Sequence, residues 1–377
     1  MALILTDEQT MLQESARGFL AESGVKELRR VRDTRDPDGF SRDLWKAFAD
    51  MGFTGILAPE AFGGLGLGHV EAGVVMEEIG RCLTPSPFLS TAILGVSALK
   101  HAADDRKADL LPKIIAGDLI TALAVDEGAK HGPARTAMSA TRSGNGFKLD
   151  GAKAFVVDGH VADLMIVAAR TAGAPGEEAG LTLFVVDPKA RGVSIERTVM
   201  LDAHNAARIT FEGVEVDADA VLGEVDGGWK LLDGVLNAGR ACVASELTGV
   251  GDEAFTRTVD YLKQRQQFGK LIGEFQALQH RAAHLWSEVE ITKAAVLKSL
   301  QMLDEAPDAA GPYVSVAKAR AGATATLAVQ EAVQMFGGIG MTDEVDIGLF
   351  MKRARVGQEL FGDANFHTDK IARLGSY

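Results

Sequence analysis

The chain has 377 residues, enough for two or three domains of ordinary size. Hydrophobic residues make up 47% and charged residues 24%, values typical of globular proteins that exclude extensive disorder. Asp and Glu (52) outnumber Lys and Arg (39), and the net charge of −13 argues against general nucleic-acid binding, which needs a basic face.

Two cysteines, Cys82 and Cys242, lie far apart and form no CxxC pair, which argues against a zinc knuckle or a thioredoxin-like site. The N-terminus lacks a basic region followed by a long apolar run, and no stretch approaches 18 uncharged apolar residues. We therefore expect a cytoplasmic protein with no secretory signal and no membrane span.

Three segments follow one another along the chain. In residues 1–117 apolar residues recur every three or four positions, which predicts short helices, and Thr6 with Gln9 fits a helix-start capping box. Between about 118 and 225, short runs rich in β-branched residues alternate with turn signals, which predicts a small antiparallel barrel or sandwich (120–125, 154–157, 164–167, 181–186 and 208–211). From 226 to 377, long proline-free helical patterns predict a four-helix bundle (228–263, 275–305 and 313–336).

The run Gly63-Gly-Leu-Gly-Leu-Gly68 suggests a dinucleotide-binding loop, but it follows a predicted helix instead of a strand. We interpret it as a tight turn between helices. His280 and His284 are four residues apart on a predicted helix, but no Glu follows the first His, so we expect a polar helix face or subunit contact and no metal.

Two further segments are rich in glycine and polar residues. Gln334-Met-Phe-Gly-Gly-Ile-Gly340 ends a long helix, either as a glycine cap or as a place where the backbone approaches a phosphate or a flavin. The segment 261–276 combines a helix ending at Arg265, a Phe268-Gly269 pair and a new helix opening at Phe275-Gln276, which is an unusual combination.

With these segments the chain resembles the acyl-CoA dehydrogenase flavoproteins over essentially its whole length. Supporting segments, in order, include 57–68, 77–80, 111–117, 149–153, 162–163, 221–223, 334–342 and 353–356. The resemblance implies an acyl-CoA dehydrogenase-like fold, with an all-α N-domain (1–117), an antiparallel β middle domain (118–225) and a C-terminal four-helix bundle (226–377). This is the order that periodicity predicts.

The resemblance also implies FAD bound between subunits of a dimer, usually within a tetramer, with the ring on one subunit and the adenosine half on its neighbour. Residues that match the family's cofactor contacts are Arg265, Gln267, Phe268, Phe275, Gln276, Gln334, Gly337 and Gly338. Their chemistry suits the task, because Arg forks onto phosphate oxygens and glycine admits close backbone approach.

The implied reaction is α,β-dehydrogenation of an acyl-CoA thioester in fatty-acid or steroid side-chain degradation, with electrons passed to an electron-transfer flavoprotein. In the family a Glu removes the α-proton, but both usual Glu positions differ here, being Phe361 and Gly239, the residue before Arg240. Loss of a positioned base typically costs about 10²–10⁴-fold.

Three carboxylates are candidate substitutes for the missing base. Glu246 lies seven residues after Gly239 on the same predicted helix face, so it either reaches the pocket or is a buried carboxylate paired elsewhere. Glu359 and Asp363 flank Phe361, and each is either a base or a solvated surface group.

The part that holds the flavin ring departs from the family as well. Val125-Asp-Glu-Gly-Ala-Lys-His-Gly132 replaces a Glu-Pro-Gly-x-Gly-Ser stretch, and Phe155-Val-Val157 lacks the usual hydroxyl, which leaves the backbone N–H groups of Val156 and Val157 for the flavin. This combination resembles the small subunit of heteromeric dehydrogenases of the pimeloyl-CoA and steroid side-chain type. Two hypotheses stay open: a self-sufficient dehydrogenase forming a homo-oligomer, or a non-catalytic subunit that completes the FAD site of a larger partner in a heterotetramer.

Overall fold

The computed structural model describes residues 3–375, which form two compact units that do not follow chain order. Within the described residues, unit 1 comprises 3–29, 69–85 and 240–375, and unit 2 comprises 30–68 and 86–239. Helices α2 (Gly24–Thr34) and α7 (Trp229–Leu262) contribute residues to both units.

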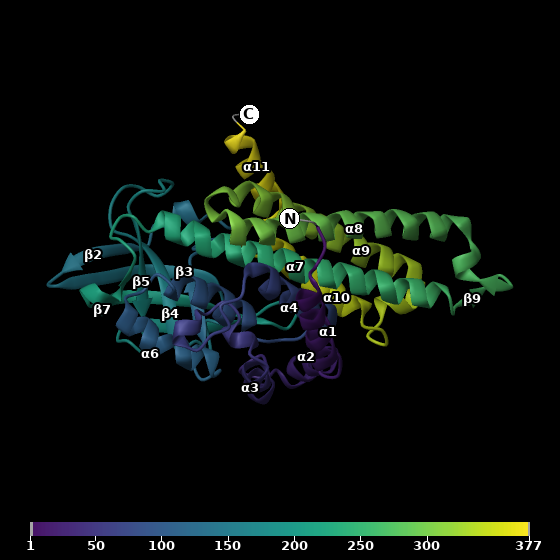
Figure 1. The fold of residues 1–377 in the computed structure, drawn as a ribbon, viewed down its shortest axis with the longest axis horizontal. Coiled ribbons are helices and arrows are strands. Elements are labelled where there is room, and N and C mark those ends of the chain that lie inside the picture. The colour runs from purple at the N-terminus through teal and green to yellow at the C-terminus, as the bar shows by residue number, and fades with distance from the viewer. Residues whose placement is uncertain (1–2, 376–377) are drawn as a thin grey trace. The chain divides into compact units, whose positions relative to one another are not determined.

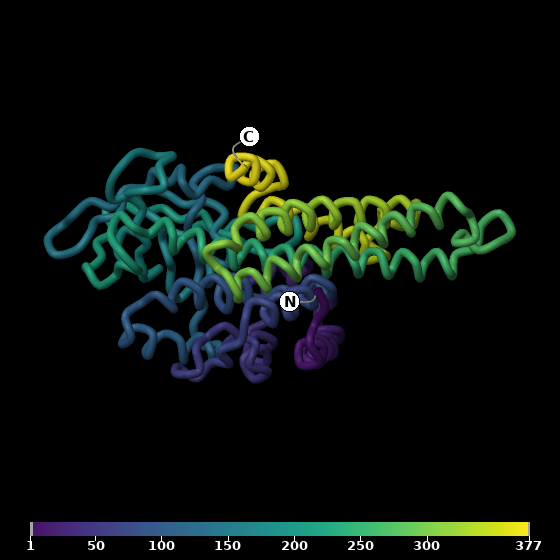
Figure 2. Tube along the Cα trace, turned by 45° about the horizontal axis from the view of Figure 1, so that its top comes forward, coloured from purple at the N-terminus to yellow at the C-terminus, as the bar shows by residue number. Residues whose placement is uncertain are grey.

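Unit 1 is helical and is built around α9 (Gly311–Phe336). Helices α8 (Gln276–Glu305), α10 (Ile347–Glu359) and α11 (Ala364–Leu374) pack against α9, and α4 (His69–Cys82) packs against α8 and α1 (Asp7–Ala21). Figures 1 and 2 show the long helices side by side, with the β9–β10 hairpin beyond the ends of α7 and α8. Short helical turns complete the unit: η6 (Ile272–Glu274), η7 (Pro307–Ala309) and η8 (Gly337–Met341).

The helix starts of unit 1 follow from local chemistry. Thr6 accepts a hydrogen bond from the N–H of Gln9, whose side chain in turn accepts one from the N–H of Thr6, so the predicted capping box is confirmed. Asp363 caps α11 in the same manner by accepting from the N–H of Phe366. The long helices lie within two residues of their expected bounds.

Unit 2 contains short helices and a sheet. The helical elements are α3 (Arg42–Asp50), η1 (Phe53–Gly55), η2 (Glu60–Phe62), the π-helical turn η3 (Phe88–Gly95), α5 (Val96–Leu99), α6 (Asp104–Ile115), η4 (Pro133–Arg135) and η5 (Ala218–Ala220). The run Gly63–Gly68 lies between η2 and α4 with no strand before it, which confirms the tight-turn interpretation.

The sheet has eight strands within the described part of unit 2: β1 (Thr121–Ala124), β2 (Ser139–Ser143), β3 (Gly146–Val157), β4 (Leu164–Arg170), β5 (Leu181–Val186), β6 (Val193–Val199), β7 (Asn205–Val216) and β8 (Val221–Leu222). Their order is β6-β7-β3-β2-β4-β5-β8, with β1 paired to β4. Most pairs are antiparallel, as expected, but β1 and β2 each pair parallel with β4, which corrects a purely antiparallel interpretation.

One face of the sheet carries the core of unit 2. Along β3 and β7 buried positions largely alternate with exposed ones, among them Leu149 and Ile209, because successive strand residues point to opposite faces. Strand β4 is instead buried on both faces. Among the helices of residues 3–375, none combines the length and the apolar character needed to cross a bilayer.

Candidate functional site

The segment after α7 forms a two-residue β-hairpin. Strand β9 (Gln266–Gln267) pairs antiparallel with β10 (Lys270–Leu271), with Gln267 opposite Lys270. The two turn residues, Phe268 (φ +55°) and Gly269 (φ +82°), are both left-handed, as a type I′ turn requires. This geometry explains the unusual Phe-Gly pair and leaves the Phe268 side chain 92% exposed.

The hairpin presents cationic and aromatic groups. Arg265 is exposed, and within residues 3–375 no carboxylate pairs with its guanidinium. Lys270 places its ammonium 4.2 Å from the centre of the Phe275 ring, and Phe268 meets the same ring edge-on at 6.2 Å. A guanidinium without a carboxylate partner, on a hairpin that also carries aromatic rings, suits a phosphate-bearing nucleotide.

The predicted glycine-rich segment begins where α9 ends. Gly337 caps α9 with φ +67°, and both Gly337 and Gly338 are exposed, with no atom within 4 Å of the place where a Cβ would stand. Gln334, one turn earlier, is exposed too. The segment therefore offers an open backbone surface of the kind that a bulky flat ligand can approach. Of the predicted cofactor contacts, the structure places Arg265, Gln267, Phe268, Phe275, Gln276, Gln334, Gly337 and Gly338 in unit 1.

The other predicted contacts, Val156 and Val157, lie in unit 2 at the end of β3. The pairing of β3 with β7 is irregular between Lys153 and Val156, where Phe155 adopts φ +52° and is 53% exposed. Such a bulge re-aims side chains at the edge of a sheet. Here it turns an aromatic ring outward beside the two valines.

The loop after β1 is held by buried charges. The ammonium of Lys153 donates to the carbonyl of Val125 at 2.9 Å and to Glu127 at 2.7 Å. Asp126 lies 2.8 Å from Nδ1 of His131 and accepts from the N–H of Gly132. Burial opposes ionisation of Asp126, but His131 and Gly132 together keep the pKa of its carboxyl below the usual range. The loop thus has its own ordered structure without the family's Pro and Ser.

Glu246, the first candidate base, forms a buried ion pair. Its two carboxylate oxygens accept hydrogen bonds from Nε and Nη2 of Arg353 at 2.6 and 2.7 Å, and only 3% of Glu246 is exposed. Both oxygens are occupied in a bidentate pair. This geometry favours the second alternative for Glu246, a helix carboxylate paired elsewhere, over the role of base.

Phe361 occupies a sharp corner between α10 and α11. Phe361 has φ +56°, and its carbonyl accepts a hydrogen bond from Nε of Arg240. The ammonium of Lys318 donates to the carbonyls of Gln358 and Gly362, both at 3.0 Å. Two buried cations, one from α7 and one from α9, therefore fix the backbone of the corner.

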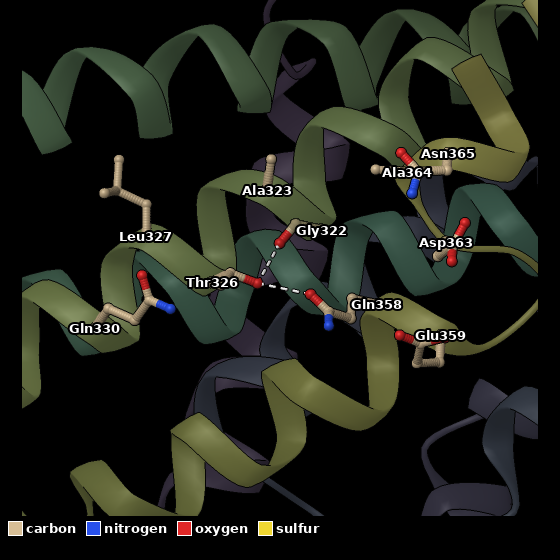
Figure 3. A pocket seen from close by; sticks show the side chains of 10 residues that line it. All are labelled: Gly322, Ala323, Thr326, Leu327, Gln330, Gln358, Glu359, Asp363, Ala364 and Asn365. Atoms are coloured by element: carbon tan, nitrogen blue, oxygen red, sulfur yellow. Dashed lines mark hydrogen bonds between the residues drawn. The ribbon is translucent and has the colours of Figure 1, made fainter. Parts of the chain in front are cut away.

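The acidic neighbours of Phe361 line a pocket of about 360 Å³ between α9 and the start of α11 (Figure 3). Glu359 also pairs with Arg355 at 2.8 Å. Across the pocket the hydroxyl of Thr326 donates to the carbonyl of Gly322 and to the side-chain oxygen of Gln358, both at 2.8 Å. Glu359 and Asp363 are therefore pocket-lining groups, and the structure keeps them as candidates for chemistry.

Comparison with known proteins identifies the family. Three family models match in order: the acyl-CoA dehydrogenase N-terminal domain at residues 6–118, the middle domain at 124–214 and the C-terminal domain at 226–375. Cyclohex-1-ene-1-carbonyl-CoA dehydrogenase of Syntrophus aciditrophicus is 30% identical over 98% of this chain and 89% of its own. The chain belongs to the acyl-CoA dehydrogenase family.

Two other family members are similar over nearly the whole chain. The short/branched chain specific acyl-CoA dehydrogenase of Rattus norvegicus is 27% identical over 98% of this chain and 85% of its own. A solved structure described as a Tcur3481-Tcur3483 steroid ACAD variant is 28% identical, covers 98% of each chain and superposes with a TM-score of 0.88. The predicted fold class is thereby confirmed.

Members of the acyl-CoA dehydrogenase family bind FAD. The donor set of unit 1 fits the adenosine and pyrophosphate half of that cofactor, since Arg265 has no competing carboxylate and Gly337 and Gly338 leave open space. The ring half fits through backbone only, because Val157 carries no hydroxyl.

Several residues of the site escaped sequence reasoning. The roles of Lys318 and Arg353 were missed, although each is a cation set among apolar residues at helical spacing, for example Lys318 beside Val314 and Ala321. A charge on a buried stripe is the signal that could have identified them.

Within residues 3–375 no group of three His, Cys, Asp or Glu side chains gathers as metal ligands, and His280 and His284 are exposed on α8.

Proposed function

We propose that this chain takes part in FAD-dependent α,β-dehydrogenation of an acyl-CoA thioester as the subunit that completes the FAD site of a larger acyl-CoA dehydrogenase chain. One observation carries the proposal: Phe361 and Gly239 fill both usual base positions, and Glu246, the nearest substitute on α7, is occupied by Arg353. Without a base of its own, the chain depends on a partner for removal of the α-proton.

In this role the chain's own residues bind and orient. Arg265 neutralises the pyrophosphate, Phe268 and Phe275 supply flat apolar surface, and the backbone at Gly337–Gly338 lies against the adenosine. When bound, FAD supplies the acceptor for the substrate's β-hydride. The larger chain supplies the carboxylate base, and an electron-transfer flavoprotein takes the electrons.

The solved relative named Tcur3481-Tcur3483 supports this two-chain arrangement, because its name joins two components and refers to a steroid ACAD. For the present chain we propose a heterotetramer with a larger acyl-CoA dehydrogenase chain. The acyl group is a fatty-acid or steroid side-chain thioester, and the assembly is cytoplasmic.

A second candidate function is a self-sufficient dehydrogenase in a homo-oligomer. The observation that favours it is the pocket between α9 and α11, which Glu359 and Asp363 both line. A carboxylate beside a cavity can accept a proton if substrate enters. In this alternative one of these residues, or Glu246, is the base.

The decisive experiment measures the FAD content of the chain purified alone and then adds a panel of acyl-CoA thioesters anaerobically. The proposal expects little FAD, or FAD whose absorbance no thioester bleaches, and bleaching once a larger chain that carries Glu-Gly is added. Full FAD occupancy with bleaching by the isolated chain would overturn it. In that case Glu246→Gln, Glu359→Gln and Asp363→Asn identify the base by loss of bleaching.

A binding variant tests the cofactor assignment separately. In whichever assembly binds FAD, the chain alone or its complex with the larger chain, Arg265→Ala is expected to weaken FAD binding by about tenfold or more, because a charge-assisted phosphate contact is lost. Arg373→Ala is the matched control, since that arginine is 78% exposed and pairs with Asp369 of the same helix. Equal FAD content in both variants would contradict the assignment of Arg265.

A further inference from the structure

The segment from Gly337 to Asp346 connects α9 to α10 and holds the two glycines that the proposed function places against the adenosine. Three of its first four residues are glycine, and glycine loses more backbone freedom on ordering than any other residue. Met341 within it is 77% exposed. A ligand surface built from such a segment needs supports elsewhere in the fold.

The first support is an aromatic stack. The ring of Tyr261 on α7 lies parallel to that of Phe336, the last residue of α9, with centroids 4.3 Å apart and an angle of 12° between the planes. Phe336 directly precedes Gly337, and Tyr261 lies one turn before Arg265, whose N–H donates to the Tyr261 carbonyl at 2.9 Å. The stack therefore ties the pyrophosphate arginine to the start of the glycine-rich segment.

The second support is a carboxylate shared by two arginines. Asp346, which directly precedes α10, accepts hydrogen bonds from Nη2 and Nε of Arg29 at 2.7 and 3.1 Å, and from Nη1 of Arg257 at 2.9 Å. Arg29 also donates to the carbonyl of Asp343 at 3.1 Å. The guanidinium of Arg257 lies 5.1 Å from the centre of the Phe350 ring, which keeps it in place on α7. Helices α2 and α7 thus hold the far end of the segment.

We infer that Tyr261 and Asp346 are positioning residues that hold the two ends of the glycine-rich segment in the geometry that receives the adenosine half of FAD. The inference rests on the proposed function for its ligand. Neither side chain need touch the cofactor. Each restricts the backbone conformations of Gly337 and Gly338 before the ligand binds. Less conformational entropy is then lost on binding.

Hydrogen exchange tests the positioning role without any cofactor. In the full-length chain, Tyr261→Leu and Asp346→Asn are expected to raise amide exchange in residues 337–343 by about tenfold, with exchange in α8 and in the sheet unchanged. Tyr261→Phe keeps the stack and is expected to behave as wild type. Asp369→Asn, which removes an exposed carboxylate paired with Arg373, is the matched control for charge. Unchanged exchange in both Tyr261→Leu and Asp346→Asn would overturn the inference.

FAD binding by the same variants, measured in whichever assembly binds FAD, supplies the second readout. Tyr261→Leu and Asp346→Asn are expected to weaken FAD binding about tenfold. Tyr261→Phe is expected to bind FAD as tightly as wild type does. If exchange rises but FAD affinity stays at the wild-type value, the supports do not serve the cofactor and the inference fails. If Arg265→Ala also leaves affinity unchanged, the proposed cofactor site itself fails, so the two failures are distinguishable.

Discussion

Lys318 lies inside unit 1 with its ammonium nitrogen 3.0 Å from the carbonyl oxygen of Gly362, at the corner that carries Phe361. Burial, with the nearby Arg240 guanidinium adding to it, lowers the pKa of Lys318 to about 7. A cation held so close to neutrality makes the stability of the corner depend on pH.

The Lys318 prediction concerns alkaline pH. Above pH 7 the folded protein has released this proton, whereas the unfolded chain keeps it up to about 10.5. The unfolded state then binds more protons, so the contribution of Lys318 to the free energy of unfolding rises with pH, by at most about 1.4 kcal/mol per unit. Denaturant titrations between pH 7 and 10 are expected to show this rise in wild type and not in Lys318→Met. Lys113→Met, which replaces a half-exposed lysine, is the control and should show the same rise in stability with pH as wild type.

Glu77 on α4 gives the opposite dependence at acid pH. Burial raises the pKa of Glu77 to about 7, although Arg81 opposes the shift. Between pH 4.5 and 7 the folded state binds the extra proton, so the contribution of Glu77 to stability is present at low pH and is lost as pH rises through 7.

At pH 8 we expect the free energy of unfolding of Glu77→Gln, measured by denaturant titration, to exceed that of wild type by up to about 3 kcal/mol. Near pH 4.5 the two proteins should be equally stable. Glu71→Gln, on the same helix, is the control. A variant less stable than wild type at pH 8 would contradict this prediction.

The buried pair of Glu246 and Arg353 is expected to be strongly coupled. Removing one partner leaves an uncompensated buried charge, so Glu246→Gln and Arg353→Met should each lower the free energy of unfolding by about 3–5 kcal/mol. The double variant Glu246→Leu with Arg353→Met should recover most of that loss. A double-mutant cycle in urea measures the coupling, and additive losses would show that the pair is not a unit.

Gly362 is expected to tolerate no side chain. Its φ is +110°, and a Cβ there would meet the Phe366 ring and lie 3.0 Å from Nε2 of His367. Gly176 has nearly the same φ (+105°) but open space around it. Gly176→Ala therefore measures backbone strain alone, about 1–3 kcal/mol, and Gly362→Ala should cost about 1–3 kcal/mol more for the clash. Equal thermal stability of the two variants would refute the clash.

The sequence predicted those helices and strands that carry a strong pattern of apolar residues. The bounds of α7, α8 and α9 followed from long proline-free helical patterns, and β1, β4 and β5 from apolar runs. Strands β2 and β6 were missed because their side chains are mostly polar and exposed, as in Val193–Val199, and they form only by pairing with β3 and β7.

The cofactor contacts expected from the sequence remain predictions, and most of them lie within single segments of the chain. The segment from Arg265 to Phe275 and the glycines after α9 are local features, so the sequence draws attention to them, but their cofactor role came from the family resemblance and the β9–β10 hairpin was not predicted. The pairing of Glu246 with Arg353 joins residues 107 positions apart, and the support of Gly362 by Lys318 joins residues 44 apart. Helical periodicity places each residue on a face of its own helix but does not say which side chain of another helix meets it.

The buried bond between Glu246 and Arg353 also restricts how this protein can change during evolution. Loss of either charge alone leaves the other buried without a partner, which is destabilising. A sequence that replaces one of the two residues is therefore expected to replace both. Among relatives of this chain, Glu246 and Arg353 are expected to be kept together or replaced together.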